Sequence, residues 1–234
     1  MSTILLTFTF YSSFEIAIMK IFILLLGFLS LSSQTNCSSS SAPQVQEEQQ
    51  PDLEGLSKAY FASGCFWCVE AIFESVRGVK EVISGYSGGA KSDANYNEVS
   101  AGRTDHAEAV EVYFDSDVDY QTLLEVFFGS HDPTTLNRQG PDRGAQYRSA
   151  IFYQNQSEKE LAESYIAKLT EEKVFDDKIV TEVVPLEAFY QAEDYHQDYE
   201  RHNPNNPYVR SVSIPRLKRF QAKFPHLLKE NQAH

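Results

Sequence analysis

From Leu56 onward, the apolar residues of this chain switch repeatedly between a spacing of two, typical of strands, and a helical spacing. The pattern predicts, in order, a strand at 58–63, a helix at 65–77, strands at 79–85 and 105–114, a helix at 119–129 and a strand at 149–154. This βαββαβ order is that of a ferredoxin-like two-layer sandwich. The sequence therefore predicts an α+β fold.

Further elements are appended to that sandwich. A capping box from Ser157 to Glu160 predicts an added helix, and residues 178–186 predict an added strand. The C-terminal tail is rich in loops, because residues 189–207 combine an irregular helix with an Asn/Pro loop. The basic stretch 216–223 has its simplest interpretation as a solvated helix face.

Turn-forming residues mark the connections. Residues 86–89 predict a turn, 90–104 a loop, and Gly129 the C-cap of its helix. The loop 131–146 is long and polar, and loops of that length in compact domains tend to be functional or disordered. Its many turn formers and its abrupt end at Tyr147 favour function.

The stretch Gly64–Glu70 holds two of the three cysteines and the only tryptophan. Cys65 falls where a strand becomes a helix, and the free N–H groups and dipole of a helix N terminus favour a thiolate. Cys65 is therefore predicted to be the nucleophile. Cys68 lies one turn along the same face, close enough to form a disulfide with Cys65 or to resolve an oxidised form of it.

Several kinds of site share this cysteine spacing. A structural zinc ion needs four ligands, and the chain has no second pair of cysteines. A static disulfide, a pair of buried thiols and a thioredoxin-like redox centre all remain open at this point. Of these readings, the pattern favours redox chemistry.

Glu108 has the same parity as Val110, Val112 and Phe114, which form the apolar side of the strand at 105–114. A carboxyl group on that side would be buried, and burial disfavours its charged form. The alternative is that the strand starts after Glu108, which would leave this side chain in solvent.

Residues 1–36 have the layout of a signal peptide. A short basic segment, Met19-Lys20, precedes an apolar run over 21–31 and a polar exit. The run is too short to span a membrane comfortably, which takes about 20 apolar residues. Because residues 1–18 contain no basic residue, Met19 is the expected working start.

A flexible tether rich in Ser, Gln and Glu follows at 37–55, ahead of a folded domain at 56–234. Cys37 resembles the lipid-modified first residue of bacterial lipoproteins, and ordinary signal cleavage nearby is the alternative. Either route predicts an exported protein of the cell envelope or periplasm, as a monomer. The net charge of -13 argues against a nucleic-acid partner, since phosphate binding requires a basic surface.

From about Leu56 to about Pro207, the chain resembles the peptide methionine sulfoxide reductases of type A. The resemblance rests on separated motifs in the right order: Gly64-Cys65-Phe66-Trp67, Tyr96-Asn97-Glu98-Val99, His106-Ala107-Glu108, Gln139-Gly140-Pro141-Asp142, Gln146-Tyr147-Arg148-Ser149 and Glu193-Asp194-Tyr195-His196-Gln197. One such motif would be weak, whereas the ordered set is specific.

The resemblance implies reduction of methionine S-sulfoxide, free or in proteins, to methionine. It implies that Cys65 attacks the sulfoxide sulfur and that Glu108 is the acid that protonates the oxygen. It also implies that Phe66 and Trp67 form an apolar wall for the substrate methyl group. Tyr96 and Tyr147 would be the phenols that bind the oxygen, and Asp142 the carboxylate that helps order the site. No metal or organic cofactor is implied, only an external thiol reductant such as thioredoxin. We expect His106, His131 and His196 to be structural.

Cys68 departs from many members of that family, which have Gly there and recycling cysteines near the C terminus. No cysteine follows Cys68 in this chain. Our hypothesis is that Cys68 resolves the sulfenic acid on Cys65, giving a disulfide that a thioredoxin-like protein reduces. The rival is a one-cysteine cycle, in which an external thiol attacks directly.

Two other functions fit part of the pattern. An envelope thiol–disulfide oxidoreductase would use the Cys65 and Cys68 pair and would need no buried acid. A non-enzymatic surface lipoprotein would keep the fold as a binding module. The intact set of site residues argues against this second alternative.

Overall fold

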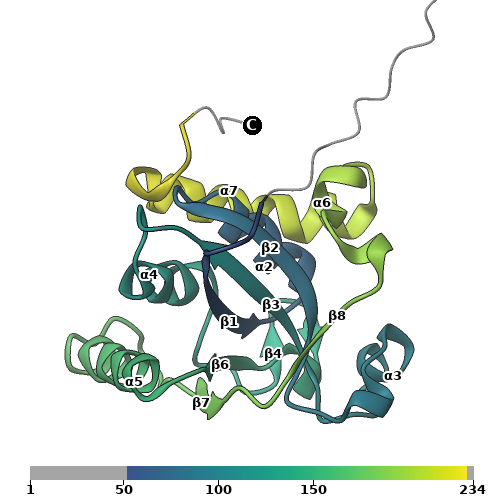
Figure 1. Cartoon of the computed structure of the whole chain (residues 1–234), viewed down its shortest axis with the longest axis horizontal. Helices are drawn as coiled ribbons and strands as arrows, with labels where there is room; N and C mark the ends of the chain where they lie inside the picture. Colours follow the sequence, from purple (N-terminus) through teal and green to yellow (C-terminus); the bar gives the residue numbers. More distant parts are fainter. Residues whose placement is uncertain (1–51, 231–234) are drawn as a thin grey trace, which may run out of the picture. The chain divides into compact units, whose positions relative to one another are not determined.

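The computed structural model describes residues 52–230. Its strands and α-helices follow one another along the chain as shown in Figure 1. They are β1 (Ser57–Ser63), α2 (Phe66–Glu74), β2 (Val79–Ser87), α3 (Tyr96–Ser100), β3 (Ala107–Phe114), α4 (Tyr120–Ser130), β4 (Arg138–Gln139), β5 (Asp142–Arg143), β6 (Ser149–Tyr153), α5 (Gln156–Glu171), β7 (Glu182–Pro185), β8 (Phe189–Gln191), α6 (Tyr199–His202) and α7 (Ile214–Lys223).

One six-stranded sheet organises the domain, in the order β7-β6-β1-β3-β2-β8. Its neighbouring strands run antiparallel, except β6 and β7. Phe61 of β1 pairs with Val110 of β3 on one side and with Ile151 of β6 on the other. The fold is therefore mixed α/β, with a sheet that curls in Figure 1. Elements β1, α2, β2, β3, α4 and β6 occur in the predicted order, with α3 and the β4–β5 hairpin inserted.

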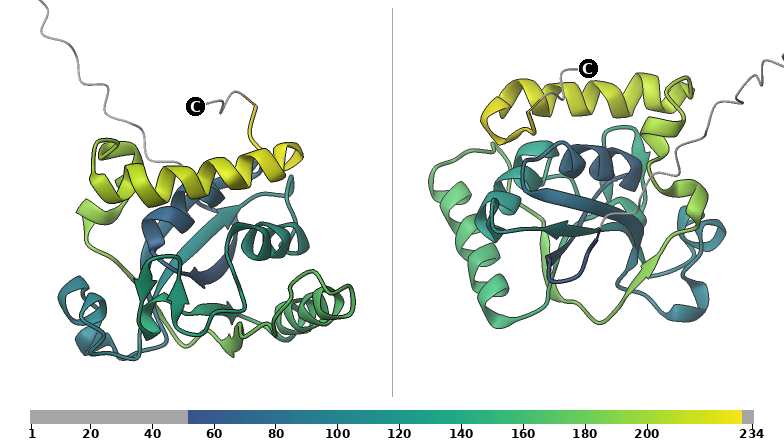
Figure 2. Two further views of the ribbon diagram at one scale, coloured as in Figure 1. Left: turned by 180° about the vertical axis from the view of Figure 1, so that it is seen from behind. Right: turned by 45° about the horizontal axis from the view of Figure 1, so that its top comes forward.

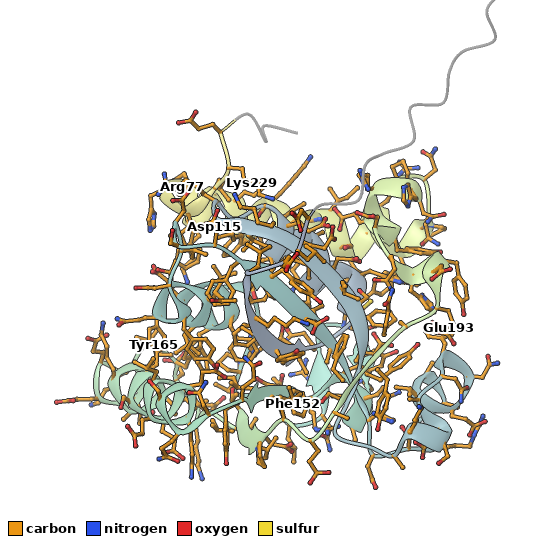
Figure 3. All side chains as sticks on the ribbon, in the orientation of Figure 1. Arg77, Asp115, Phe152, Tyr165, Glu193 and Lys229 are labelled. Carbon is orange, nitrogen blue, oxygen red and sulfur yellow. The ribbon has the colours of Figure 1, made fainter. Side chains whose placement is uncertain are left out.

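Aromatic side chains form the core between the sheet and its helices. Phe61 stacks on Phe73 of α2 and on Phe127 of α4, with ring centroids 5.1 and 5.3 Å away, and all three are fully buried. Burying a side chain of this size stabilises the fold by about 1.5–3 kcal/mol, so Phe61 anchors both helices to β1. Farther out, Tyr165 of α5, labelled in Figure 3, stacks on Phe128 of α4.

Both faces of β3 are covered, and each of its residues is buried. On the face away from α2, Glu111 accepts hydrogen bonds from the Tyr60 and Tyr113 hydroxyls and from the Lys58 ammonium group. A carboxyl group on either face of β3 is therefore removed from water. Which groups surround it decides its role.

Helix α7 adds a layer over α2 and α4 that the predicted two-layer sandwich does not contain (Figure 2). Arg216, Leu217 and Phe220 are its buried residues. The prediction of a solvated face for 216–223 is wrong at these positions, because residues spaced at i, i+1 and i+4 share one side of a helix. The remaining basic residues of α7 do point to solvent.

Several connections are more ordered than predicted. The turn predicted at 86–89 is wrong at its start, because Tyr86 and Ser87 continue β2 and pair with Glu108 and Ala107 of β3. The predicted loop 90–104 contains α3, which Asn95 caps by accepting a hydrogen bond from the backbone N–H of residue 98. The loop 131–146 contains the β4–β5 hairpin.

Other element boundaries also shift. Helix α2 ends at residue 74 rather than 77, and β7 covers only part of the predicted strand 178–186. The capping box of α5 lies two residues earlier than predicted. Asn155 accepts from the backbone N–H of Glu158, and the Glu158 carboxylate accepts from the N–H of Gln154. Asn155 with Glu158 and Ser157 with Glu160 both have the residue types of a capping box, and the helix begins at the first of them.

Gly129 lies inside α4, so its prediction as the C-cap is wrong; His131 occupies that position. A Cβ atom at residue 129 would lie 2.5 Å from the ring of Phe224, which follows α7. Gly129 therefore allows α4 and the end of α7 to approach closely.

The predicted signal peptide, the working start at Met19, Cys37 and the tether up to residue 51 lie outside the described residues. Within residues 52–230, no helix has the length and apolar character needed to cross a bilayer.

The packing at Gly129 predicts an unusual sign for a helical substitution. Alanine in a helix interior is normally more stable than glycine by about 0.8–1.0 kcal/mol. At residue 129 the clash with Phe224 should outweigh this gain, because overpacking costs about 1–3 kcal/mol. Gly129→Ala should therefore lower the free energy of unfolding, measured by urea denaturation, whereas the same change in a Phe224→Ala background should raise it. Equal effects in both backgrounds would contradict the assigned contact.

Candidate active site

The turn between β1 and α2 places the two cysteines. Gly64 has a φ of 97°, which favours glycine, and a Cβ atom there would lie 2.7 Å from Gln139. Cys65 is the N-cap of α2, and Cys68 lies in its first turn. Their exposed fractions are 7% and 2%, and both are free thiols. The structure thus brings the pair together at a buried helix start.

Glu108 of β3 reaches the same helix start. Its Oε2 atom accepts a hydrogen bond of 3.0 Å from the backbone N–H of Phe66, and the side chain is 2% exposed. The prediction that Glu108 points to the apolar side of its strand is confirmed. Burial, followed by the charge of Asp142, raises the pKa of Glu108 to about 8, although the Phe66 N–H opposes the rise. Glu108 is therefore a neutral acid near pH 7.

The cysteine pair does not have the protonation that the helix start alone predicts. Burial raises the pKa of Cys65 well above its ordinary value, and the neighbouring Cys68 and Glu108 raise it further. A hydrogen bond from Cys65 and the charge of Arg216 lower the pKa of Cys68 to about 7, against the effect of burial. These surroundings therefore favour the thiol form of Cys65, and Glu108 occupies the Phe66 N–H, one of the helix-start groups expected to favour a thiolate.

Asp142 reaches the cysteines through Tyr208. The Tyr208 hydroxyl donates a hydrogen bond of 2.6 Å to Asp142 Oδ2 and lies 3.9 Å from Cys68 Sγ. Asp142 itself is half-buried on β5, and burial raises its pKa. Sequence reasoning missed Tyr208, which lies just past the stretch that carries the resemblance.

Tyr96 and Tyr147 lie near the same centre. Burial raises the pKa of both phenols, that of Tyr96 to about 12, and the charges of Glu108 and Cys65 add to both shifts. Glu193, labelled in Figure 3, holds Tyr96 in place by accepting from its backbone N–H. The other carboxylate oxygen of Glu193 accepts from Tyr86 of β2.

An aromatic wall closes the site on the α2 side. The Trp67 ring stacks on Tyr199 of α6 at 3.7 Å with an angle of 7° between the planes. Its Nε1 donates to Nδ1 of His196, whose ring lies 5.0 Å from Phe66. Burial lowers the pKa of His196, so it is neutral and orients Trp67. Tyr199 is a further wall residue that sequence reasoning did not assign.

The predicted structural histidines are each hydrogen-bonded. His106 contacts the carbonyl of Ala90, and His131 contacts Phe127 O and Ser149 Oγ. Within residues 52–230, no cluster of three or more His, Cys, Asp or Glu side chains is arranged to hold a metal ion.

Arg216 is a third residue that sequence reasoning missed. From α7, its Nε donates to Ser130 O, and its Nη2 donates to the carbonyl and hydroxyl of Ser63, at the end of β1. The helical spacing shared with Leu217 and Phe220 was the signal that could have marked it as buried.

A cavity of about 410 Å³ lies beside this centre, between α2, α6 and α7. Trp67 borders it, whereas neither Cys65 nor Glu108 does. Glu70 and Glu74 line it, and burial raises the pKa of both, that of Glu74 to about 8. Because the reactive groups are elsewhere, the chemistry is assigned to the cysteine and Glu108 centre rather than to this cavity.

Comparisons with known proteins agree with one another. Residues 57–228 match the family described as peptide methionine sulfoxide reductase. Peptide methionine sulfoxide reductase MsrA 2 of Synechocystis sp. is 52% identical over 177 residues, which are 75% of this chain and 83% of that protein. MsrA of Natronomonas pharaonis is 52% identical over 167 residues, which are 71% of this chain and 94% of that protein.

Solved structures give the same result. Reduced Mxr1 from Saccharomyces cerevisiae has a TM-score of 0.58 and 36% identity, covering 64% of this chain and 87% of that chain. Methionine sulfoxide reductase A of Corynebacterium diphtheriae has a TM-score of 0.57 and 36% identity, covering 64% of this chain and 76% of that chain.

Burial of Glu108 predicts a pH-dependent stability. Its pKa is about 8 in the folded protein, against roughly 4.3 in an unfolded chain. The raised pKa contributes stability fully below pH 4, and this contribution is lost as the pH rises through 8. Between pH 5 and 8, wild type should therefore lose stability relative to Glu108→Gln, by a few kcal/mol on the order-of-magnitude scale of such shifts.

Urea denaturation at several pH values measures this difference. Asp119→Asn is the control, because the stability that Asp119 contributes should depend on pH in the opposite direction. Hydrogen bonds from Thr122 lower the pKa of Asp119, so this stability is lost only as the pH falls through that lowered value. A difference between wild type and Glu108→Gln that stays constant from pH 5 to 8 would contradict a neutral buried Glu108.

Proposed function

The chain belongs to the peptide methionine sulfoxide reductase family, and on that premise we propose that it reduces the S epimer of methionine sulfoxide, free or in proteins, to methionine. One observation carries the proposal. A neutral, buried Glu108 carboxyl group sits on the same helix start as Cys65. A sulfoxide oxygen leaves sulfur poorly until it is protonated, so the reaction needs such an acid beside its nucleophile.

In the first step, Cys65 Sγ attacks the sulfoxide sulfur while Glu108 protonates the oxygen. The oxygen passes to Cys65, which becomes a sulfenic acid, and methionine leaves. The Cys65 proton replaces the one that Glu108 donates, so the carboxyl group is neutral again after the step. The sulfoxide sulfur is reduced by two electrons and the cysteine sulfur is oxidised by two.

The surrounding residues hold the substrate. Phe66 and Trp67 contact its methyl group, and Tyr96 and Tyr147 hydrogen-bond its oxygen. Asp142 orders the site through Tyr208. Stacking on Tyr199 and the hydrogen bond to His196 hold the Trp67 ring in one orientation, which a small methyl pocket requires.

In the second step, Cys68 attacks the sulfenic acid, and a Cys65–Cys68 disulfide forms. An external thiol, such as a thioredoxin-like protein, then reduces that disulfide. The position of Cys68 in the first turn of α2 and its lowered pKa support this role. In the rival one-cysteine cycle, the external thiol attacks the sulfenic acid directly.

The proposal extends to the rest of the chain. Residues 1–36 act as a signal peptide with a working start at Met19, 37–55 form a tether, and the reductase domain begins at residue 56. Cys37 is lipidated, so the enzyme works in the cell envelope as an anchored monomer. The layout of the sequence supports this assignment. The antiparallel order β6-β1-β3-β2 supports an elaborated ferredoxin-like sandwich.

Glu108→Gln tests the reaction and its acid. Wild type should reduce the S sulfoxide of a methionine derivative and not the R sulfoxide. Glu108→Gln should lower that rate by about 10²–10⁴-fold, because an amide cannot protonate the oxygen.

Glu70→Gln is the matched control, since Glu70 is also a buried carboxyl group with a raised pKa but lies on the neighbouring cavity. It should keep activity within a few fold. Reduction of the R epimer alone would contradict the proposal. A chain that reduces neither epimer, but whose wild type and Glu108→Gln exchange disulfides equally well, would instead favour an envelope thiol–disulfide oxidoreductase.

Cys68→Ser tests the resolving step. After one turnover without reductant, wild type should lose two free thiols, whereas Cys68→Ser should lose one and retain a sulfenic acid that mass spectrometry detects. The first burst of methionine should stay within about threefold of wild type, because Cys65 still attacks. A wild-type enzyme that keeps the Cys68 thiol after turnover would support the one-cysteine cycle.

A further inference from the structure

Arg216 is a buried cation, 8% exposed, and within residues 52–230 its hydrogen bonds reach no carboxylate. Its three hydrogen bonds go to neutral groups, the carbonyls of Ser130 and Ser63 and the Ser63 hydroxyl. A buried charge without an opposite charge is strongly unfavourable, so a nearby anion should compensate it.

The guanidinium group lies against the reactive turn. Its Nη2 bonds Ser63, two residues before Cys65, and its Nη1 lies 3.5 Å from where a Cβ atom of Gly64 would be. Its charge acts on Cys68 and also on Asp142, where it opposes the rise in pKa that burial causes. Asp142 and Cys68 are therefore the groups near the reactive turn whose anionic forms this charge favours.

The hydroxyl groups near Cys68 have their protons directed elsewhere. Tyr208 donates to Asp142 at 2.6 Å, and Ser213 donates to Glu200. Hydrogen bonds from Ser213 and Tyr208 also lower the pKa of Cys68, but a hydroxyl group carries one proton, so each must give up its present bond to reach the thiolate. The stabilisers available without such a rearrangement are the hydrogen bond from Cys65 and the positive charge of Arg216.

The first of these stabilisers is consumed by the reaction, because the Cys65 thiol no longer exists once it is a sulfenic acid. We propose that Arg216 is a positioning residue for the second step, whose buried guanidinium holds the Cys68 sulfur as an anion while Cys65 is a sulfenic acid. The inference rests on the resolving role proposed above for Cys68.

The step balances with groups already present. The Cys68 thiolate attacks Cys65 Sγ, an S–S bond forms and the S–O bond of the sulfenic acid breaks. The oxygen leaves as water after taking a proton from the neutral Glu108 carboxyl group, which becomes a carboxylate and regains a proton from solvent. The Cys68 sulfur is oxidised by one electron and the Cys65 sulfur is reduced by one.

The groups that face Cys68 come from every element packed around it. When ionised, the acids among them oppose a thiolate, and Arg216 favours one. They are Cys65 at the start of α2, Glu108 on β3, Asp142 on β5, Tyr208 and Ser213 before α7, and Arg216 on α7.

Single-turnover kinetics test the inference. Reduced full-length enzyme is mixed with one equivalent of methionine S-sulfoxide without reductant, then quenched, alkylated and analysed by mass spectrometry between pH 5.5 and 9. Wild-type disulfide formation should rise with pH to a midpoint below about 8.5, the ordinary pKa of a thiol, because Arg216 favours the Cys68 thiolate. Arg216→Gln should raise the midpoint by about one unit or more and slow the step about 3- to 10-fold at pH 7. A thiolate of higher pKa is a better nucleophile, but this gain is smaller than the loss in the fraction of Cys68 that is ionised.

Arg216→Lys is the matched control, since it keeps the charge and loses the planar fork. Its midpoint should stay within about half a unit of wild type, and the burst of methionine should be unchanged within about twofold in both variants. A merely structural Arg216 would slow both steps and leave the midpoint at its wild-type value, which would overturn the inference.

A titration covers the case in which Arg216→Gln does not fold. In a Cys37→Ser, Cys65→Ser enzyme that retains Arg216, the thiolate absorbance of Cys68 should rise with a midpoint well below the ordinary value of about 8.5. A midpoint at or above that value would overturn the inference. If wild type forms no disulfide, both the resolving role of Cys68 and the Arg216 inference are contradicted. If wild type forms the disulfide but Arg216→Gln does not shift the midpoint, only the Arg216 inference is contradicted.

Discussion

The hydrogen bond from the Phe66 N–H to Glu108 joins the start of α2 to the middle of the sheet, and the rest of the site depends on it. It holds the acid beside Cys65 without exposing either group to water. It also occupies the N–H that would otherwise favour a thiolate at Cys65. The resting centre therefore favours the neutral forms of Cys65 and Glu108, the proposed nucleophile and acid, which a buried site tolerates far better than two charges.

The two halves of the chain contribute different parts of this centre. The strands and helix up to β3 supply the cysteine pair, Glu108 and the rings of Phe66 and Trp67, whereas the partners of Trp67 and the buried cation come from the last segments. Tyr199 fixes the face of Trp67, Tyr208 links Asp142 to Cys68, and Arg216 reaches the end of β1 from α7. Helix α7 is thus part of the site as well as an added layer.

Two cysteines three residues apart have different electrostatic surroundings. Cys65 is next to a carboxyl group and deep in the core, which favours its thiol. The positive charge of Arg216 acts on Cys68 and favours its thiolate. Such a difference suits a pair in which one sulfur receives an oxygen and the other displaces it, because each step needs its own nucleophile.

The sequence by itself determined the order of strands and helices, the position of Cys65 at a helix start and the inward direction of Glu108. These features depend on the local spacing of apolar residues, which can be read along the chain as a repeat of two in strands and a helical repeat in helices. The protonation of the cysteines, the stacking of Trp67 on Tyr199 and the burial of Arg216 depended on which distant segments pack together. Only the tertiary structure decided them, since a pKa and an aromatic contact are set by neighbours in space rather than along the chain.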